Sequence, residues 1–292
     1  MFIALEVMEQ KKRSLVPAVL HKLAIGRGKP RMWLEQRSCC GKQYAALRCE
    51  GNRPIDWEAV ERVCGTYGKR LLLPEGLTPP EDSRLPAPAF PQFRARMIAH
   101  TACEVVARTR MPMYRRTVGF VDIRGNYPGL LRQLLKFYTS AVVVTGERAY
   151  YETVRQELMD TLGAPVVIGS GFESLADCVL VVSPDDMYTS QSLPSGCPVM
   201  TGGSLVAQGR FDRISGLRYV PAAEIGDTCP AGIDTALFAA ALCEFSGMDF
   251  PTYFAQEMLY NYKSATIDEV ARIIAHCAGV DTPEQRDCSR QV

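Results

Sequence analysis

The sequence has no long apolar run, little histidine and almost no net charge, and these shortages exclude several classes of protein. No stretch approaches the ~18 consecutive apolar residues that a membrane-spanning helix needs. Glu6 and Glu9 interrupt the first apolar stretch, which does not fit a signal peptide. Lysine and arginine number 33 against 32 acidic residues, a formal charge of +1 that argues against binding nucleic acid by phosphate neutralisation. We therefore expect a cytoplasmic protein with no membrane or nucleic-acid partner.

Clusters of residues that carry chemistry are also scarce. The three histidines all fall in predicted helices, and neither a G-x-S-x-G elbow nor a P-loop signature is present. Cys39 and Cys40 with Cys49 lack the paired C-x-x-C spacing of a structural zinc site. Cys197 lies between glycine and proline, a setting that favours exposure. The sequence predicts no metal site and identifies no catalytic residue.

The eleven cysteines fit a reduced protein better than a disulfide framework. Eleven is an odd number, and no export signal is evident. Most of the cysteines lie among apolar neighbours, where small buried hydrophobic residues are expected: Cys64, Cys103, Cys178, Cys243 and Cys277. We expect free thiols.

Residues 118–182 contain an alternation of apolar runs and amphipathic helices. Apolar runs at 118–123, 141–145, 165–169 and 178–182 alternate with helical patterns at 127–139 and 147–162. Short apolar strands separated by helices are typical of a parallel sheet that is covered on both faces. The pattern predicts an α/β fold with a Rossmann-like domain, to which runs at 197–201 and 217–221 add further strands. Such sheets bind ligands where the carboxyl ends of strands meet helix amino termini.

The chain divides by composition into three segments. Residues 1–115 form an amino-terminal α/β unit with paired strands at 31–36 and 43–49, a helix at 56–67, a strand at 70–74, a proline-rich linker at 74–91 and a helix at 92–108. Residues 116–226 form the Rossmann-like domain, and residues 227–292 are expected to be helical. Asp234 caps one carboxy-terminal helix, and Thr266 with Glu269 forms a capping box for another. These apolar helices could cover the sheet or pair with another subunit. The sequence is therefore compatible with a homo-oligomer and with a monomer.

The turn after the first strand of this domain is the first candidate binding element. Gly125 and Gly129 leave room for a phosphate near the helix start, with Arg124 and Asn126 beside them. The G-x-G-x-x-G spacing is absent, and Pro128 removes one N–H donor. Alternatively, proline and glycine here only start a helix and make a tight turn.

The end of the second strand supplies Glu147 and Arg148. Glu147 lies 22 residues after Gly125, close to the spacing at which an acid binds the ribose hydroxyls of a dinucleotide. Arg148 could instead pair with a 2′-phosphate. The alternative is that an acid at a helix start interacts only with the helix dipole.

The fourth strand ends at Ser183, which is followed by Asp185 and Asp186. Ser183 and Asp185 are candidates to line the cofactor crevice, and residues 201–204 could form another crevice loop. Helix or turn capping is the competing interpretation of these polar residues.

The order of these parts is similar to that of shikimate dehydrogenase, glutamyl-tRNA reductase and amino-acid dehydrogenases. The resemblance covers residues 116–225 and rests on 118–123, 141–148 and the segment Ala176–Ser183. It implies a catalytic unit before a Rossmann domain, with helices closing the chain. The glycine fingerprint of these families is missing, and no lysine–aspartate dyad can be assigned.

Three hypotheses follow for function. The first is an NAD(P)-dependent oxidoreductase that acts on a small molecule, with phosphate near 124–129 and ribose near Glu147 or Arg148. The second is a non-catalytic binding or regulatory protein that kept a degenerate dinucleotide-binding scaffold. The third is an enzyme that uses the same sheet edge for another nucleotide or a phosphate ester.

Overall fold

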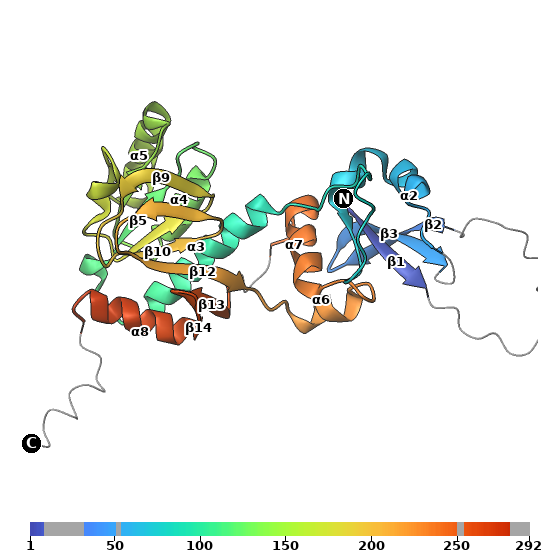
Figure 1. Cartoon of the computed structure of the whole chain (residues 1–292). Helices are drawn as coiled ribbons and strands as arrows, with labels where there is room; N and C mark the ends of the chain where they lie inside the picture. The colour runs from blue at the N-terminus through green and yellow to red at the C-terminus, as the bar shows by residue number, and fades with distance from the viewer. Residues whose placement is uncertain (9–31, 51–53, 250–253, 281–292) are drawn as a thin grey trace, which may run out of the picture. The chain divides into compact units, whose positions relative to one another are not determined.

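The computed structural model describes residues 1–8, 32–50, 54–249 and 254–280. These residues pack as two compact units, which differ from the three segments expected from the sequence (Figure 1). The amino-terminal unit is formed by the described residues within 1–90 and 221–249, and the parallel-sheet unit by those within 91–220 and 250–292. The chain therefore leaves the first unit, builds most of the second, and returns. Within the described residues, no helix is both long and apolar enough to cross a membrane.

The amino-terminal unit is built on a four-stranded sheet in the order β2-β3-β1-β4. β1 runs parallel to β3 and β4, and β2 pairs with β3 as an antiparallel hairpin. The hairpin turns at Cys40 and Gly41, which both have the positive φ of a type I′ turn. The paired strands predicted here are confirmed. The bounds are β1 Ile3–Met8, β2 Met32–Cys39, β3 Lys42–Glu50 and β4 Leu71–Leu72.

Two helices of this unit begin after an aspartate that caps the helix start, and one of these, Asp234, was predicted as a cap. Asp56 accepts a hydrogen bond from Ala59 N at 3.1 Å, and Asp234 accepts one from Leu237 N at 2.8 Å. The first helix ends at Cys64, earlier than expected, and the chain continues as a 3-10 turn from Gly65. The proline-rich segment between β4 and residue 91 contains no helix or strand. The helices are α2 Trp57–Cys64, η1 Gly65–Arg70, α6 Ala223–Thr228 and α7 Thr235–Ser246.

The parallel-sheet unit contains an eight-stranded sheet in the order β14-β13-β12-β10-β8-β5-β6-β7. β5 pairs in parallel with both β6 and β8, β6 with β7, and β10 with both β8 and β12. Counted from β5, the six parallel strands have the spatial order 3-2-1-4-5-6 of doubly wound dinucleotide-binding folds. The predicted Rossmann-like sheet is confirmed. Its parallel strands are β5 Thr117–Val121, β6 Ser140–Val144, β7 Val166–Ile168, β8 Leu180–Ser183, β10 Pro198–Thr201 and β12 Asp212–Arg218.

The two faces of this sheet are covered differently. One face packs against the helices α3 Pro91–Arg108, α4 Pro128–Leu134, α5 Arg148–Leu162 and α8 Ile267–Cys277. The other packs against the 3-10 turn η3 Phe172–Leu175 and a small sheet of β9 Met187–Ser192 and β11 Leu205–Gln208. A Cβ atom at Gly119 would lie 2.8 Å from Val181 and 2.9 Å from Leu175. Glycine in β5 therefore allows this second layer to approach closely.

Several predictions for this unit are corrected. The segment from 227 onward is not entirely helical, because β13 Glu257–Tyr260 and β14 Lys263–Thr266 form a hairpin that extends the sheet beyond β12. The helix predicted over 127–139 ends at Leu134, and the hydroxyl of Tyr138 donates to the carbonyl of Ala102. The strand expected at 217–221 is β12, which ends at Arg218. The capping box of Thr266 and Glu269 is confirmed.

Candidate functional site

The strand order reverses between β5 and β8, which makes the carboxyl ends of these strands the topological switch point of the sheet. β6 and β7 lie on one side of β5, whereas β8, β10 and β12 lie on the other. The turn from β5 to α4 and the residues after β8 meet at this edge. Ligands of open α/β sheets bind at such a point.

The side chain of Asp122 occupies the centre of the turn after β5. It is 3% exposed. Its Oδ1 accepts the N–H of Asn126 at 3.0 Å, and its Oδ2 accepts the N–H of Tyr127 at 2.8 Å and the hydroxyl of Tyr151 at 2.6 Å. Pro128, which follows Tyr127, is the first residue of α4 and has no N–H to donate. The donors at this helix start thus already bind a carboxylate of the chain itself.

Tyr127 connects the turn after β5 to the end of β8. Its hydroxyl donates to Asp185 Oδ1 at 2.8 Å, and Asn126 Nδ2 lies 3.5 Å from Asp185 Oδ2. Burial and the hydrogen bond to Asp185 raise the pKa of Tyr127 well above its usual value. Burial and the bond to Asp122 do the same for the pKa of Tyr151. Both phenols therefore stay protonated near neutral pH and act as donors.

Arg94, from the first turns of α3, reaches the same edge of the sheet. A Cβ atom at Gly202, just after β10, would lie 2.9 Å from Arg94 Cγ and 3.0 Å from the carbonyl oxygen of Pro184. The Arg94 side chain therefore passes over Gly202 beside the chain that leaves β8. Its Nε is buried and has no hydrogen-bond partner among the described residues.

The structure brings some of the residues predicted from the sequence together. Gly125 has φ +68°, and a Cβ atom there would lie 3.1 Å from Glu147 Cγ, so these two predicted residues are neighbours. Asp185 and Asn126 meet as described above. Ser183 is 2% exposed and donates to the carbonyl of Asp185 at 3.3 Å. The role of these residues in binding a cofactor stays a prediction.

Other predicted residues stand apart from the contacts at the switch point. Arg124, Gly129 and Arg148 are exposed. In the loop at 201–204, the N–H of Ser204 donates to Asp186 Oδ1 at 2.6 Å. This hydrogen bond joins the loop to the turn after β8. Asp186 therefore acts as a turn acceptor, which was the competing interpretation of the acids after β8.

Sequence reasoning missed Asp122 as an acceptor, Tyr127 and Tyr151 as donors, and Arg94. An aspartate directly after a buried strand and six residues before the first residue of a helix is a signal for an internal cap. Arg94 carried no signal, because its position depends on how α3 packs against the sheet.

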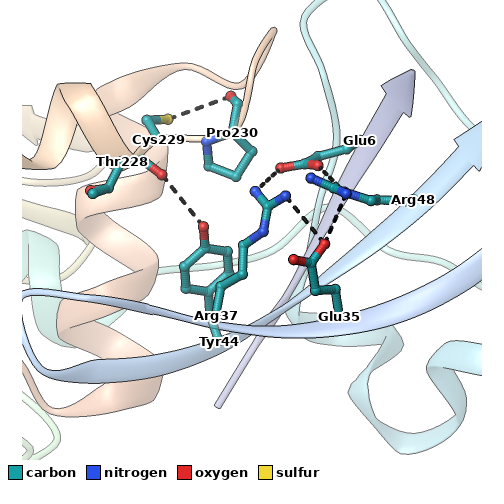
Figure 2. Close-up of polar contacts among 8 residues, drawn as sticks. All are labelled: Glu6, Glu35, Arg37, Tyr44, Arg48, Thr228, Cys229 and Pro230. Carbon is teal, nitrogen blue, oxygen red and sulfur yellow. Dashed lines mark hydrogen bonds and ion pairs between the residues drawn. The ribbon is translucent and has the colours of Figure 1, made fainter. Parts of the chain in front are cut away.

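A second polar cluster lies in the amino-terminal unit, on the strands β1, β2 and β3 (Figure 2). Glu6 accepts from Arg37 at 2.6 Å and from Arg48 at 3.0 Å. Glu35 lies 3.0 Å from Arg48 and 3.4 Å from Arg37. Each guanidinium contacts both carboxylates, so the four charges balance one another. Among the described residues, the four charges are thus paired with one another, which leaves none of them unpaired for a ligand.

The cysteines of the described residues are all free. Four of the five expected to be buried are buried, whereas Cys277 is exposed. Cys197, for which exposure was expected, is 4% exposed. Burial raises the pKa of Cys103, Cys178 and Cys197 to about 12, which keeps these thiols protonated. Within the described residues, no group of three or more histidine, cysteine or acidic side chains is arranged to hold a metal ion.

Comparison with known proteins finds structural likeness without sequence relatives. No protein-family model and no curated protein matches the chain. Among solved structures, L-tryptophan dehydrogenase from Nostoc punctiforme matches with 15% identity and a TM-score of 0.32 over 82% of this chain and 69% of that one. D-lactate dehydrogenase with NAD+ from Lactobacillus jensenii matches with 11% identity and a TM-score of 0.30 over 95% and 93%.

A third match is Δ1-pyrroline-2-carboxylate reductase from Thermococcus litoralis, in complex with NADH and L-proline. The identity is 11% and the TM-score 0.28, over 64% of this chain and 65% of the reductase, just under two thirds of its length. Similarity at these levels transfers no function, because one fold carries many activities.

Proposed function

We propose that the parallel-sheet unit is a non-catalytic binding or regulatory module that retains the scaffold of a dinucleotide-binding domain. The strand order and the switch point support a small-molecule site at the carboxyl edge of the sheet. The observation that carries the proposal is the position of Asp122, whose carboxylate accepts the N–H groups of Asn126 and Tyr127.

The residues present do not fit the pyrophosphate of NAD(P). A pyrophosphate at a helix start needs free N–H donors. Here two donors bind Asp122, and Pro128 supplies none. A pyrophosphate would also bring its negative charge next to the buried Asp122 carboxylate, which disfavours binding. Hydride transfer from NAD(P) is therefore not part of the proposed function.

The rival function is an NAD(P)-dependent oxidoreductase acting on a small molecule. One observation favours it: Glu147 lies against Gly125, where an acid that binds ribose would stand. Glu147 and Arg148 are both exposed and accessible to a ligand.

Calorimetric titration of the full chain with NAD+, NADH, NADP+ and NADPH distinguishes the two functions. We expect no saturable heat up to about 1 mM of each nucleotide, a limit that corresponds to about −4 kcal/mol. Saturable binding in the micromolar range would overturn the proposal, provided that it weakens in Glu147→Gln or Arg148→Gln. Both variants alter exposed side chains, so they should fold normally, as circular dichroism can check.

A further inference from the structure

The buried Nε of Arg94 has no hydrogen-bond acceptor among the described residues. Three buried side-chain nitrogen or oxygen atoms lack a partner within the described residues, and they belong to Arg94, Gln133 and Arg213. Gln133 is in the last turn of α4 and Arg213 is near the amino end of β12. Arg94 alone of the three lies at the carboxyl edge of the sheet. A buried donor without a partner is costly, so an unfilled acceptor position at a binding edge points to a ligand.

The backbone next to Asp185 passes close to this arginine. Arg94 Cγ and the carbonyl oxygen of Pro184 both approach Gly202, and Asp185 is the residue after Pro184. The positive charge of Arg94 also acts on Tyr127, where it partly offsets the effects of burial and of Asp185, which raise the pKa. Tyr127 therefore lies within electrostatic range of both Arg94 and Asp185.

The negative charge of Asp185 also lacks a cationic partner among the described residues. Its carboxylate is half-buried and, among the described residues, accepts hydrogen bonds only from neutral groups, the hydroxyl of Tyr127 and the amide of Asn126. Neither Asp185 nor Arg94 forms an ion pair with another described residue. The switch point thus presents one unpaired cation and one unpaired anion. A simple anion would satisfy Arg94 alone, and a simple amine would satisfy Asp185 alone.

We propose that the switch point binds a small zwitterion, a free α-amino acid, whose carboxylate pairs with Arg94 and whose ammonium group pairs with Asp185. This inference rests on the proposed function and names its ligand. The fork of an arginine side chain suits a carboxylate, since it donates two parallel hydrogen bonds. Asn126 and Tyr127 hold Asp185 in place for the ammonium group. Asp122 does not take part in this pairing, because its carboxylate already accepts the N–H groups of Asn126 and Tyr127 and the hydroxyl of Tyr151.

Thermal-shift and calorimetric titrations of the full chain with the twenty free amino acids test the proposal. We expect at least one amino acid to give a saturable stabilisation. Its carboxamide, which lacks the anion, and its des-amino acid, which lacks the cation, should each bind at least tenfold more weakly. Arg94→Gln and Asp185→Asn should each weaken binding at least tenfold, because each removes one of the two ion pairs. Arg155→Gln, at an exposed arginine of α5, is the matched control and should bind within twofold of the wild type.

The outcomes separate this inference from the proposed function. Binding of NAD(P) with loss in Glu147→Gln would overturn the proposed function. Absence of binding by any amino acid, together with absence of NAD(P) binding, would overturn the zwitterion site and leave the proposed function standing. Binding of an amino acid that is unchanged in both Arg94→Gln and Asp185→Asn would also overturn the site. Circular dichroism and ligand-free melting temperatures identify a variant that has failed to fold, and Arg94→Lys then replaces Arg94→Gln.

Discussion

The phenolic oxygen of Tyr151 lies 2.6 Å from Asp122 Oδ2, which ties the first turn of α5 to the turn after β5. With the N–H groups of Asn126 and Tyr127, this contact gives the buried carboxylate three donors. A charged group buried at the edge of a sheet is stable only when it is satisfied in this way. Asp122 therefore organises the switch point, and its contacts can be tested through the free energy of unfolding.

Asp122→Asn should destabilise the parallel-sheet unit by about 1.5–3 kcal/mol, because one amide N–H would then face the donors of Tyr127 and Tyr151. Urea denaturation followed by circular dichroism measures the change. Asp177→Asn alters an exposed aspartate of the same unit and should change the free energy by less than about 0.5 kcal/mol. Equal effects of the two substitutions would contradict the role given to Asp122.

Gly125→Ala and Gly129→Ala should change the free energy of unfolding by amounts that differ in sign or in size. Gly125 has φ +68°, and its Cβ would lie 3.1 Å from Glu147, so alanine there should cost about 1–2 kcal/mol. Gly129 lies in the first turn of α4 with nothing near its Cβ position. Alanine there should be neutral or stabilise by up to about 1 kcal/mol. Thermal unfolding of the two variants makes the comparison, and a larger loss at Gly129 would refute it.

The free energy of unfolding should decrease as the pH rises above the ordinary tyrosine pKa of 10.0. The pKa values of Tyr127 and Tyr151 are raised in the folded protein, so above pH 10 the unfolded chain releases protons that the folded chain retains. The stability that these two protonated tyrosines contribute is fully present below pH 10, the ordinary tyrosine pKa. It is lost as the pH rises toward their pKa values in the folded protein. Tyr151→Phe should flatten this slope in denaturation curves between pH 9 and 11, a range set by the ordinary pKa of 10.0. Tyr188→Phe, at a side chain that is 67% exposed, should leave the slope unchanged.

Glu6→Gln should destabilise the amino-terminal unit by about 2 kcal/mol, less than for a fully buried pair, because Arg37 and Arg48 retain some contact with water. Glu35→Gln in the same cluster should cost less than about 1 kcal/mol, since the Glu35 side chain is 43% exposed. Chemical denaturation in low salt provides the measurement. If the two losses were equal, burial would not govern the strength of this network.

The sequence predicts the parallel core because burial on both faces requires continuous apolar strands, as in 118–121 and 141–144. It also predicts helix starts, because a cap such as Asp234 or Thr266 acts through residues only three positions away. The hairpin of β13 and β14 was not predicted. Its turn residues, Asn261 and Tyr262, have positive φ in the structure. Its alternating burial depends on the neighbouring strand β12, which lies more than 35 residues earlier in the chain.

The candidate site was predicted only in part, for a similar reason. Glycines, acids and a proline near a helix start indicate where a ligand could lie, and these residues do lie at the switch point. Whether a backbone N–H is free depends on side-chain geometry, and the rotamer of Asp122 is not encoded in any local pattern. Arg94 reaches the site because α3 packs on the sheet across Gly202, a contact between residues more than 100 positions apart.

The return of the chain to the amino-terminal unit after residue 220 affects how the protein is synthesised. A ribosome releases β5 to β12 well before it releases β13, β14 and α8. Until then the nascent chain exposes the open edge of β12 and the surface of α3 that α8 later covers. An uncovered strand edge can pair with strands of other chains, so we expect this intermediate to aggregate more readily than the complete unit.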